Sequence, residues 1–115
     1  MKILLITIML LITGQPRRVL LFYKNNNKEV WAKESAELEA NKSGVRERDI
    51  NVESYEFSKN PEQWKKWKID PSESFTFILI GRDGGEKYRS EKFVSHQDLF
   101  GKIDAMPMRK NEIKK

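Results

Sequence analysis

The stretch Phe75–Ile80 (FTFILI) is a continuous apolar run, and Gly81–Gly85 (GRDGG) follows it directly. A short run of consecutive apolar residues predicts a strand that is buried on both faces of a sheet. The Asp-Gly pair supplies the positive φ angles of a tight turn, so Glu86–Arg89 is expected to return as a short antiparallel strand. A second continuous run, Arg18–Tyr23 (RVLLFY), predicts another strand of the same kind. These two buried strands form the centre of the predicted sheet.

The segment that follows the first strand predicts a helix over Lys28–Ser43. It is rich in Glu, Ala, Lys and Leu, and Trp31 and Leu38 lie seven residues apart on one face. Gly44 is a natural C-terminal cap, because glycine adopts the left-handed conformation in which many helices end. We therefore expect one continuous helix that ends at Gly44.

The middle of the chain predicts a mixed strand and a short helix. Asp49–Phe57 alternates in polarity but changes phase near Glu53, which predicts a bulge. Asn60 followed by proline is a typical helix start, and the helix should end near Lys68. Its two tryptophans, Trp64 and Trp67, share a face and are expected to pack in the core.

The last helix is expected to begin after Ser95, whose hydroxyl is a typical N-cap. Pro107 should end this helix, and the polar tail Arg109–Lys115 is expected to be frayed. The apolar stripe of the helix consists of Leu99, Phe100, Ile103 and Met106.

The contrast between continuous and mixed strands predicts the sheet order. Continuous strands should be central and mixed strands should be edges, which gives the order 2-1-3-4. The first two strands are joined through a helix and should be parallel, whereas the last two form a hairpin and should be antiparallel. The fold class is therefore α/β, with the element order β-α-β-α-β-β-α and a four-stranded mixed sheet. This three-layer arrangement resembles the thioredoxin fold.

The turn after the first strand carries Lys24–Asn27 (KNNN), where a thioredoxin-type enzyme has Cys-x-x-Cys. The chain has 115 residues and no cysteine, so the thiolate on which that chemistry depends cannot form. The sequence accordingly assigns no catalytic residue and no cofactor.

The first fourteen residues are typical of a secretory signal. Lys2 precedes an apolar run from Ile3 to Ile12, and small residues follow up to Gly14. The run is shorter than the roughly 20 residues of a membrane-spanning helix. We expect a signal peptide over 1–14, a single domain over 15–115, no transmembrane segment in the mature chain, and a secreted or periplasmic location. A buried first strand is the alternative interpretation of the same run.

The formal net charge is +5, and charges of both signs are interspersed along the chain. Such a surface favours solubility and gives little support to nucleic-acid binding, because no basic stripe with interleaved aromatics is present. The most basic element is the short helix with Trp64 and Trp67, which carries Lys65, Lys66 and Lys68. A solvated helix face explains it, and a nucleic-acid or anionic membrane surface is the alternative.

Three short runs resemble a known family. They are Glu47–Ile50 (ERDI), Gly81–Arg89 (GRDGGEKYR) and Asp98–Arg109 (DLFGKIDAMPMR). Together, over Arg18 to about Glu112, they resemble a domain of unknown function in small secreted bacterial proteins. Related domains occur in animal matrix proteins, including a coiled-coil-containing tumour-suppressor candidate and sushi-repeat proteins. The resemblance implies a thioredoxin-like or peroxiredoxin-like fold, export and no established activity.

Strand direction gathers the charged residues of these runs at one end of the sheet, opposite the Lys24–Asn27 turn. That end receives the start of the second strand, the hairpin and the end of the last helix. We consider three roles for the cluster: a structural tie made of Arg–carboxylate pairs, a surface for a ligand or partner, and acid–base catalysis by Asp49 with Asp83 or Asp104. The candidate binding residues are Arg48, Asp49, Arg82, Asp83, Asp104 and Arg109.

His96 is the only histidine, and it is expected to be a solvated residue beside the helix cap. No His, Cys or carboxylate partners stand at metal-ligand spacing, so no metal site is predicted. The preferred hypothesis is an exported, non-redox thioredoxin-like module that binds a protein or a small ligand in the cell envelope. The alternatives are a cysteine-independent oxidoreductase of peroxiredoxin type and a basic surface-binding protein.

Overall fold

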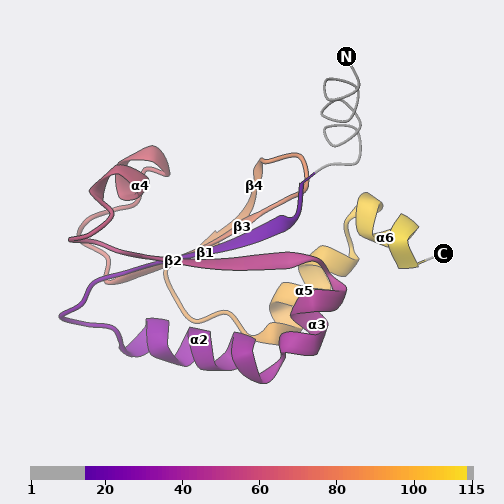
Figure 1. Cartoon of the computed structure of the whole chain (residues 1–115), viewed down its shortest axis with the longest axis horizontal. Coiled ribbons are helices and arrows are strands. Elements are labelled where there is room, and N and C mark those ends of the chain that lie inside the picture. The colour runs from indigo at the N-terminus through magenta and orange to yellow at the C-terminus, as the bar shows by residue number, and fades with distance from the viewer. Residues whose placement is uncertain (1–14, 114–115) are drawn as a thin grey trace, which may run out of the picture.

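The computed structural model describes residues 15–113. The predicted signal peptide over 1–14 lies outside these residues. The elements are β1 (Arg17–Tyr23), α2 (Glu29–Ala40), α3 (Lys42–Glu47), β2 (Ile50–Glu56), α4 (Pro61–Lys66), β3 (Phe75–Ile80), β4 (Glu86–Ser90), α5 (His96–Asp104) and α6 (Pro107–Ile113), as Figure 1 shows.

The four strands form one mixed sheet in the order β2-β1-β3-β4, which confirms the predicted order. β1 pairs with β2 in parallel, and β3 pairs antiparallel with both β1 and β4. Every residue of β3 is buried, as a continuous apolar run predicts for a central strand. The turn between β3 and β4 has Gly84 at a φ of 83°, a conformation that favours glycine.

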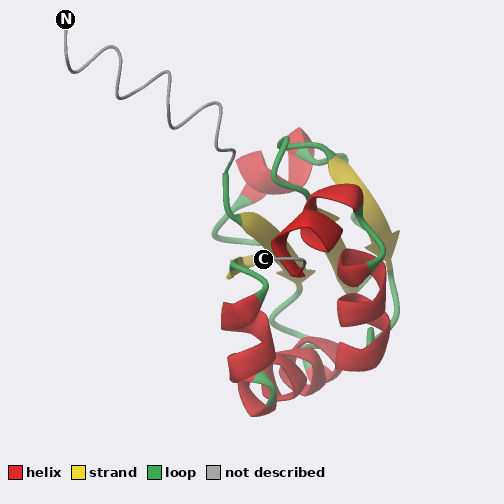
Figure 2. Ribbon diagram, turned by 90° about the vertical axis from the view of Figure 1, so that its right-hand side faces the viewer, coloured by secondary structure: helices red, strands yellow, loops and turns green. Residues whose placement is uncertain are grey.

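Alternate residues of β1 point into two separate cores, because successive side chains of a strand face opposite sides of the sheet. Val19 and Leu21 belong to the core that α2, α3 and α5 cover. Leu20 and Phe22 belong to the second core, which includes Trp64 of α4. Figures 1 and 2 show α4 on one side of the sheet, α2, α3 and α5 on the opposite side, and α6 at one end of the sheet. The expected three layers are therefore present.

The two tryptophans of the short helix pack against this second core, as predicted. Trp64 is buried, and its indole N–H donates to the Tyr55 carbonyl at 3.1 Å. Trp67 is half-buried against the same side chains. Asn60 stands at the N-cap position, but its amide donates to the Glu56 carbonyl, so the expected side-chain cap is absent.

The expected single helix over Lys28–Ser43 is two helices, and the prediction that Gly44 caps it is wrong. The helix is interrupted at Asn41, whose side-chain amide donates to the Glu37 carbonyl at 2.8 Å. Gly44 lies inside α3, and a Cβ there would meet the Phe100 ring at 2.5 Å. Close approach of α5 is therefore the reason for glycine at this position. The helical segment instead ends before Asp49, which adopts a left-handed φ of 53°.

Two further predictions are wrong. The phase change near Glu53 is not a bulge, because β1 and β2 pair in continuous register, and the irregularity lies between Leu79 and Ile80 instead. The tail after Pro107 is not frayed over Arg109–Ile113. It forms α6, because proline is well suited to the first turn of a new helix. The side chain of Arg109, a residue of this helix, is buried.

Candidate functional site

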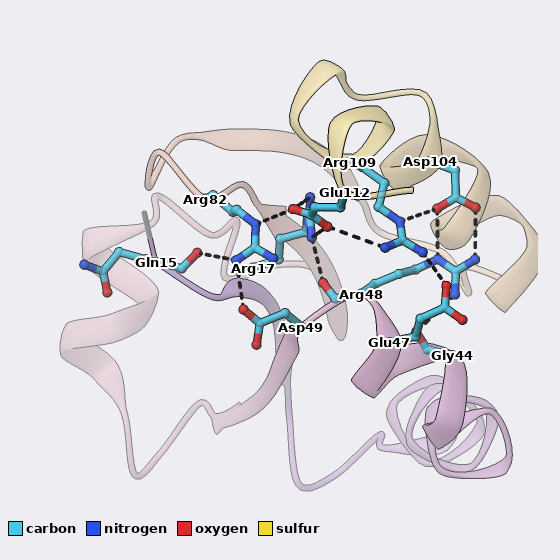
Figure 3. A network of polar contacts seen from close by, with 10 residues as sticks. All are labelled: Gln15, Arg17, Gly44, Glu47, Arg48, Asp49, Arg82, Asp104, Arg109 and Glu112. Carbon is cyan, nitrogen blue, oxygen red and sulfur yellow. Dashed lines mark hydrogen bonds and ion pairs between the residues drawn. The ribbon is translucent and has the colours of Figure 1, made fainter. Parts of the chain in front are cut away.

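Five of the six predicted binding residues meet at one end of the sheet, where α3, the β3–β4 hairpin, α5 and α6 converge (Figure 3). Together with Arg17, Glu47 and Glu112 they form a cluster of ion pairs that we call the arginine network. It comprises four arginines and four carboxylates: Arg17, Arg48, Arg82, Arg109, Glu47, Asp49, Asp104 and Glu112.

Arg48 connects α3 to α5. Its Nε and Nη2 donate to the two carboxylate oxygens of Asp104 at 3.1 and 2.9 Å, which is the bidentate geometry that makes such pairs strong. Its Nη1 donates to the Gly44 carbonyl at 3.1 Å near the end of α3. The guanidinium also lies 4.0 Å from the centre of the Phe100 ring. The Arg48 guanidinium is thus fixed by a carboxylate, a backbone carbonyl and an aromatic ring.

Arg109 anchors α6 from beneath. Its side chain is 7% exposed and donates to Asp104, to Glu47 and, at 3.5 Å, to Glu112. Asp104 therefore lies between two guanidiniums. Hydrogen bonds from Arg48, and then from Arg109, lower the pKa of the Asp104 carboxyl. A carboxylate held ionised in this way is a poor general acid, which does not favour the acid–base hypothesis.

Arg82 ties the hairpin to three other segments. Its Nε donates to Glu112 at 2.9 Å, and its Nη1 donates to Asp49 at 2.8 Å and to the Gln15 carbonyl at 3.2 Å. Of the two carboxylates, Asp49 is the more exposed, at 54% against 28% for Glu112. The hairpin, the start of β1 and the turn before β2 are therefore joined by one side chain.

Sequence reasoning missed three members of the network. Arg17 is 1% exposed and donates to the Arg48 carbonyl at 2.8 Å and to Glu112 at 3.2 Å. Glu112 lies in the tail that was expected to fray, and Glu47 belongs to a run quoted only for its family resemblance. Burial alone would raise the pKa of the Glu112 carboxyl, but hydrogen bonds from Arg82 and Arg17 lower it overall. Arg17 could have been predicted from its position. It comes directly before the buried strand, at the end of the sheet where the other charged residues gather.

Asp83 lies apart from the network. Its Oδ1 accepts from the Gly85 amide and its Oδ2 from Lys87 Nζ, at 2.9 and 2.8 Å, so it stabilises the hairpin. Lys87 lowers the pKa of this carboxyl.

A hollow of about 340 Å³ lies between the hairpin and the junction of α5 with α6, and we call it the hairpin hollow. Met106, Pro107 and Met108 form its apolar wall. Gly81 and four charged residues complete the lining: Arg17, Arg82, Asp83 and Lys87. The hollow is thus adjacent to the network and shares two of its arginines.

His96 is not the solvated residue that was expected. Its Nδ1 lies 2.6 Å from Glu37 Oε2, and its backbone N–H donates to the same oxygen. Two positions before it, the Val94 amide donates to Glu34 Oε1 at 2.8 Å. Two carboxylates of α2 therefore hold the segment that leads into α5.

The opposite end of the sheet carries the Lys24–Asn27 turn, closed by a hydrogen bond from the Asn27 amide to the Lys24 carbonyl at 3.1 Å. No thiol is present here, because the chain has no cysteine. Among residues 15–113, one group of carboxylates has its oxygens close enough together to share a cation: Asp70, Glu73 and Glu91. Asp70 already accepts two hydrogen bonds from Ser72, and we assign no metal there. Within the same residues, no helix has the length and apolar character needed to cross a membrane.

Solved structures share this fold. A protein described as a malarial protein superposes with a TM-score of 0.64 at 22% identity, covering 78% of this chain and 96% of its own. Thioredoxin-2 of the malaria parasite gives 0.65 at 22% identity, covering 79% and 84%. Trxlp from Edwardsiella tarda gives 0.60 at 20% identity, covering 76% and 82%. At these identities the likeness shows the thioredoxin-like fold alone.

Comparison by sequence finds one family. No curated protein matches the chain. One family model matches residues 11–112 and therefore includes the hairpin, α5 and nearly all of α6. The arginine network lies wholly within that match. The chain belongs to the family described as a domain of unknown function, DUF4174.

Proposed function

We propose that the protein is an exported, non-redox thioredoxin-like module that binds a small ligand or a protein partner. The observation that carries the proposal is the hairpin hollow, which lies beside a charge network whose groups are mostly paired within the fold. The network's arginines are paired with carboxylates and tie together separate elements, so most of their binding capacity is used within the fold. The hollow is the neighbouring surface where an apolar wall and charged groups remain available to a ligand.

The absence of cysteine supports the non-redox part. Thioredoxin-type exchange needs a thiolate nucleophile, and the Lys24–Asn27 turn offers amides and an ammonium in its place. The purified chain over residues 15–115 is expected neither to reduce insulin disulfides nor to consume hydrogen peroxide. Turnover of peroxide by this preparation would contradict the proposal and favour a cysteine-independent oxidoreductase.

Export is part of the proposal and rests on the sequence of residues 1–14. The test is fractionation of the native host, followed by N-terminal sequencing. We expect a chain that begins at Gln15 outside the cytoplasm. A chain that retains Met1 and stays in the cytoplasm would contradict export.

Binding is tested by native mass spectrometry of the tagged protein after gentle purification from its own host. Lys87→Glu reverses a charge of the hollow, and Lys110→Glu makes the same change at an exposed position of α6 that does not line it. We expect a bound ligand or partner on the native protein and on Lys110→Glu, and its loss from Lys87→Glu. Bare monomers in all three samples would contradict the binding function.

A further inference from the structure

The hairpin hollow has two unlike walls, and each points to one half of a ligand. The apolar wall comes from the α5–α6 junction, where Met106 also packs against the core under α5 and Met108 is 47% exposed. Methionine side chains are flexible and polarisable, so they adapt to apolar groups of different shape. This wall fits a short aliphatic or similar apolar group.

The opposite wall is mostly cationic. Arg17, Arg82 and Lys87 line it together with a single carboxylate, that of Asp83. Lys87 and Asp83 form an exposed pair with a Nζ–Oδ2 distance of 2.8 Å, and exposed pairs of this kind exchange partners at little cost. A second anion can therefore be held by Lys87 without unfolding the hairpin.

Arg17 supplies an independent observation. Its side chain is 1% exposed, yet its buried Nε has no hydrogen-bond partner among residues 15–113. Buried donors are nearly always paired in folded proteins, so Arg17, which lines the hollow, keeps a donor that the described residues do not use. A carboxylate is a strong acceptor for a guanidinium.

From these two walls we infer that the hairpin hollow binds an amphipathic carboxylate, that is, an apolar group of a few carbon atoms bearing one carboxylate. The carboxylate lies toward Arg17, Arg82 and Lys87, and the apolar group lies against Met106 and Met108. A hollow of about 340 Å³ has the size of a small-ligand site. This inference names the ligand class for the binding function proposed above and rests on it.

Two sources present this chemistry, a free short-chain acid and the C-terminal residue of a peptide. Hexanoate represents the first and N-acetyl-leucine the second, and hexanamide and N-acetyl-leucinamide are their neutral counterparts. The readout is the methyl resonances of Met106 and Met108 in the protein over residues 15–115, labelled at methionine methyl groups. These are the only methionines in that chain, so the signals report on the hollow directly.

We expect saturable shifts of both methyl signals with at least one carboxylate, and binding about ten-fold weaker with its amide, because a charge-assisted hydrogen bond is lost. Whichever acid binds more tightly identifies the source. Met108→Asp should abolish the shift of Met106. Ile113→Asp, at an exposed position of the same helix outside the hollow, should leave it unchanged.

Three results would overturn the inference: no saturable shift with either acid, equal binding of acid and amide, or full binding by Met108→Asp. If neither acid binds while Lys87→Glu still removes a ligand in the mass-spectrometry experiment, the ligand class is wrong and the binding function stands. If both experiments are negative, the proposed function is wrong as well.

Discussion

Two regions of the molecule hold their carboxyl groups in opposite ways. In the arginine network, Asp104 and Glu112 are 36% and 28% exposed, and each accepts from more than one guanidinium. In α2, Glu34 is fully buried, accepts one hydrogen bond from the Val94 amide, and has an unpartnered Oε2. Burial raises the pKa of Glu34 to about 7, whereas guanidinium hydrogen bonds lower the pKa of Asp104.

Burial and guanidinium pairing therefore move the pKa of a carboxyl in opposite directions in this fold. It also gives the two regions opposite responses to pH. A carboxyl with a lowered pKa stabilises the fold at neutral pH and loses that contribution in acid. A carboxyl with a raised pKa stabilises the fold in acid and loses its contribution as the pH rises. Substitutions of single residues in the two regions separate these contributions.

The largest effect is expected from Arg17→Ala. The change leaves a cavity at a fully buried position, removes a donor from Glu112 and leaves the Arg48 carbonyl without its partner. Breaking a buried ion pair costs about 3–5 kcal/mol, which should lower the melting temperature by at least ten degrees or so in a domain of this size. Urea unfolding at pH 7 measures the loss of free energy, and thermal unfolding at the same pH measures the fall in melting temperature. Arg17→Met keeps most of the volume and should cost clearly less. Equal stability of native protein and Arg17→Ala would show that the network does not hold the fold.

Glu34→Gln should stabilise the protein at alkaline pH. Because the pKa of Glu34 is raised from 4.5 to about 7, its favourable contribution is complete below about pH 4.5 and is lost as the pH rises through about 7. The neutral amide does not ionise, so the variant should gain on the order of 2–3 kcal/mol over the native protein at pH 8. At pH 4 the two should be nearly equal. The measurement is urea unfolding across this pH range, and a constant difference between the two proteins would contradict the account of Glu34.

Asp104→Asn should reduce the acid sensitivity of the fold. The lowered pKa of Asp104 means that its contribution is present above about pH 4 and is lost as the pH falls through its folded-state value. Because the side chain is about a third exposed, solvent screening limits the expected loss at pH 7 to about 1 kcal/mol. Thermal unfolding at pH 7 and pH 3 measures it. If Asp104→Asn lost more stability relative to the native protein at pH 3 than at pH 7, the result would contradict the lowered pKa of Asp104.

The sequence predicted the sheet because its two central strands are the two continuous apolar runs of the domain. The same strand directions placed Arg48, Asp49, Arg82, Asp104 and Arg109 at one end, and the structure brings these five together. The partners of Arg109 and Glu112 could not be predicted in the same way, because they depend on where α6 lies. Pro107 was expected to end the last helix of the chain. In the structure it is the first residue of α6.

Glu34 was missed for a different reason. The segment Glu29–Ala40 contains several glutamates, and a charged residue in such a helix is usually solvated. Its position was nevertheless informative, because Glu34 lies between Trp31 and Leu38 on the face that packs against the core. A glutamate in an apolar stripe is the pattern that indicates a buried acid, and only the tertiary contact with Val94 shows its partner.

The most direct test of the account compares thermal unfolding of Arg109→Ala and Lys110→Ala at pH 7. The two residues are neighbours on α6, but Arg109 is buried among three carboxylates and Lys110 is exposed. The account predicts a loss of about 2–3 kcal/mol for Arg109→Ala and almost none for Lys110→Ala. Equal melting temperatures for the two variants would contradict it, and would mean that the contacts of Arg109 with these carboxylates do not stabilise the fold.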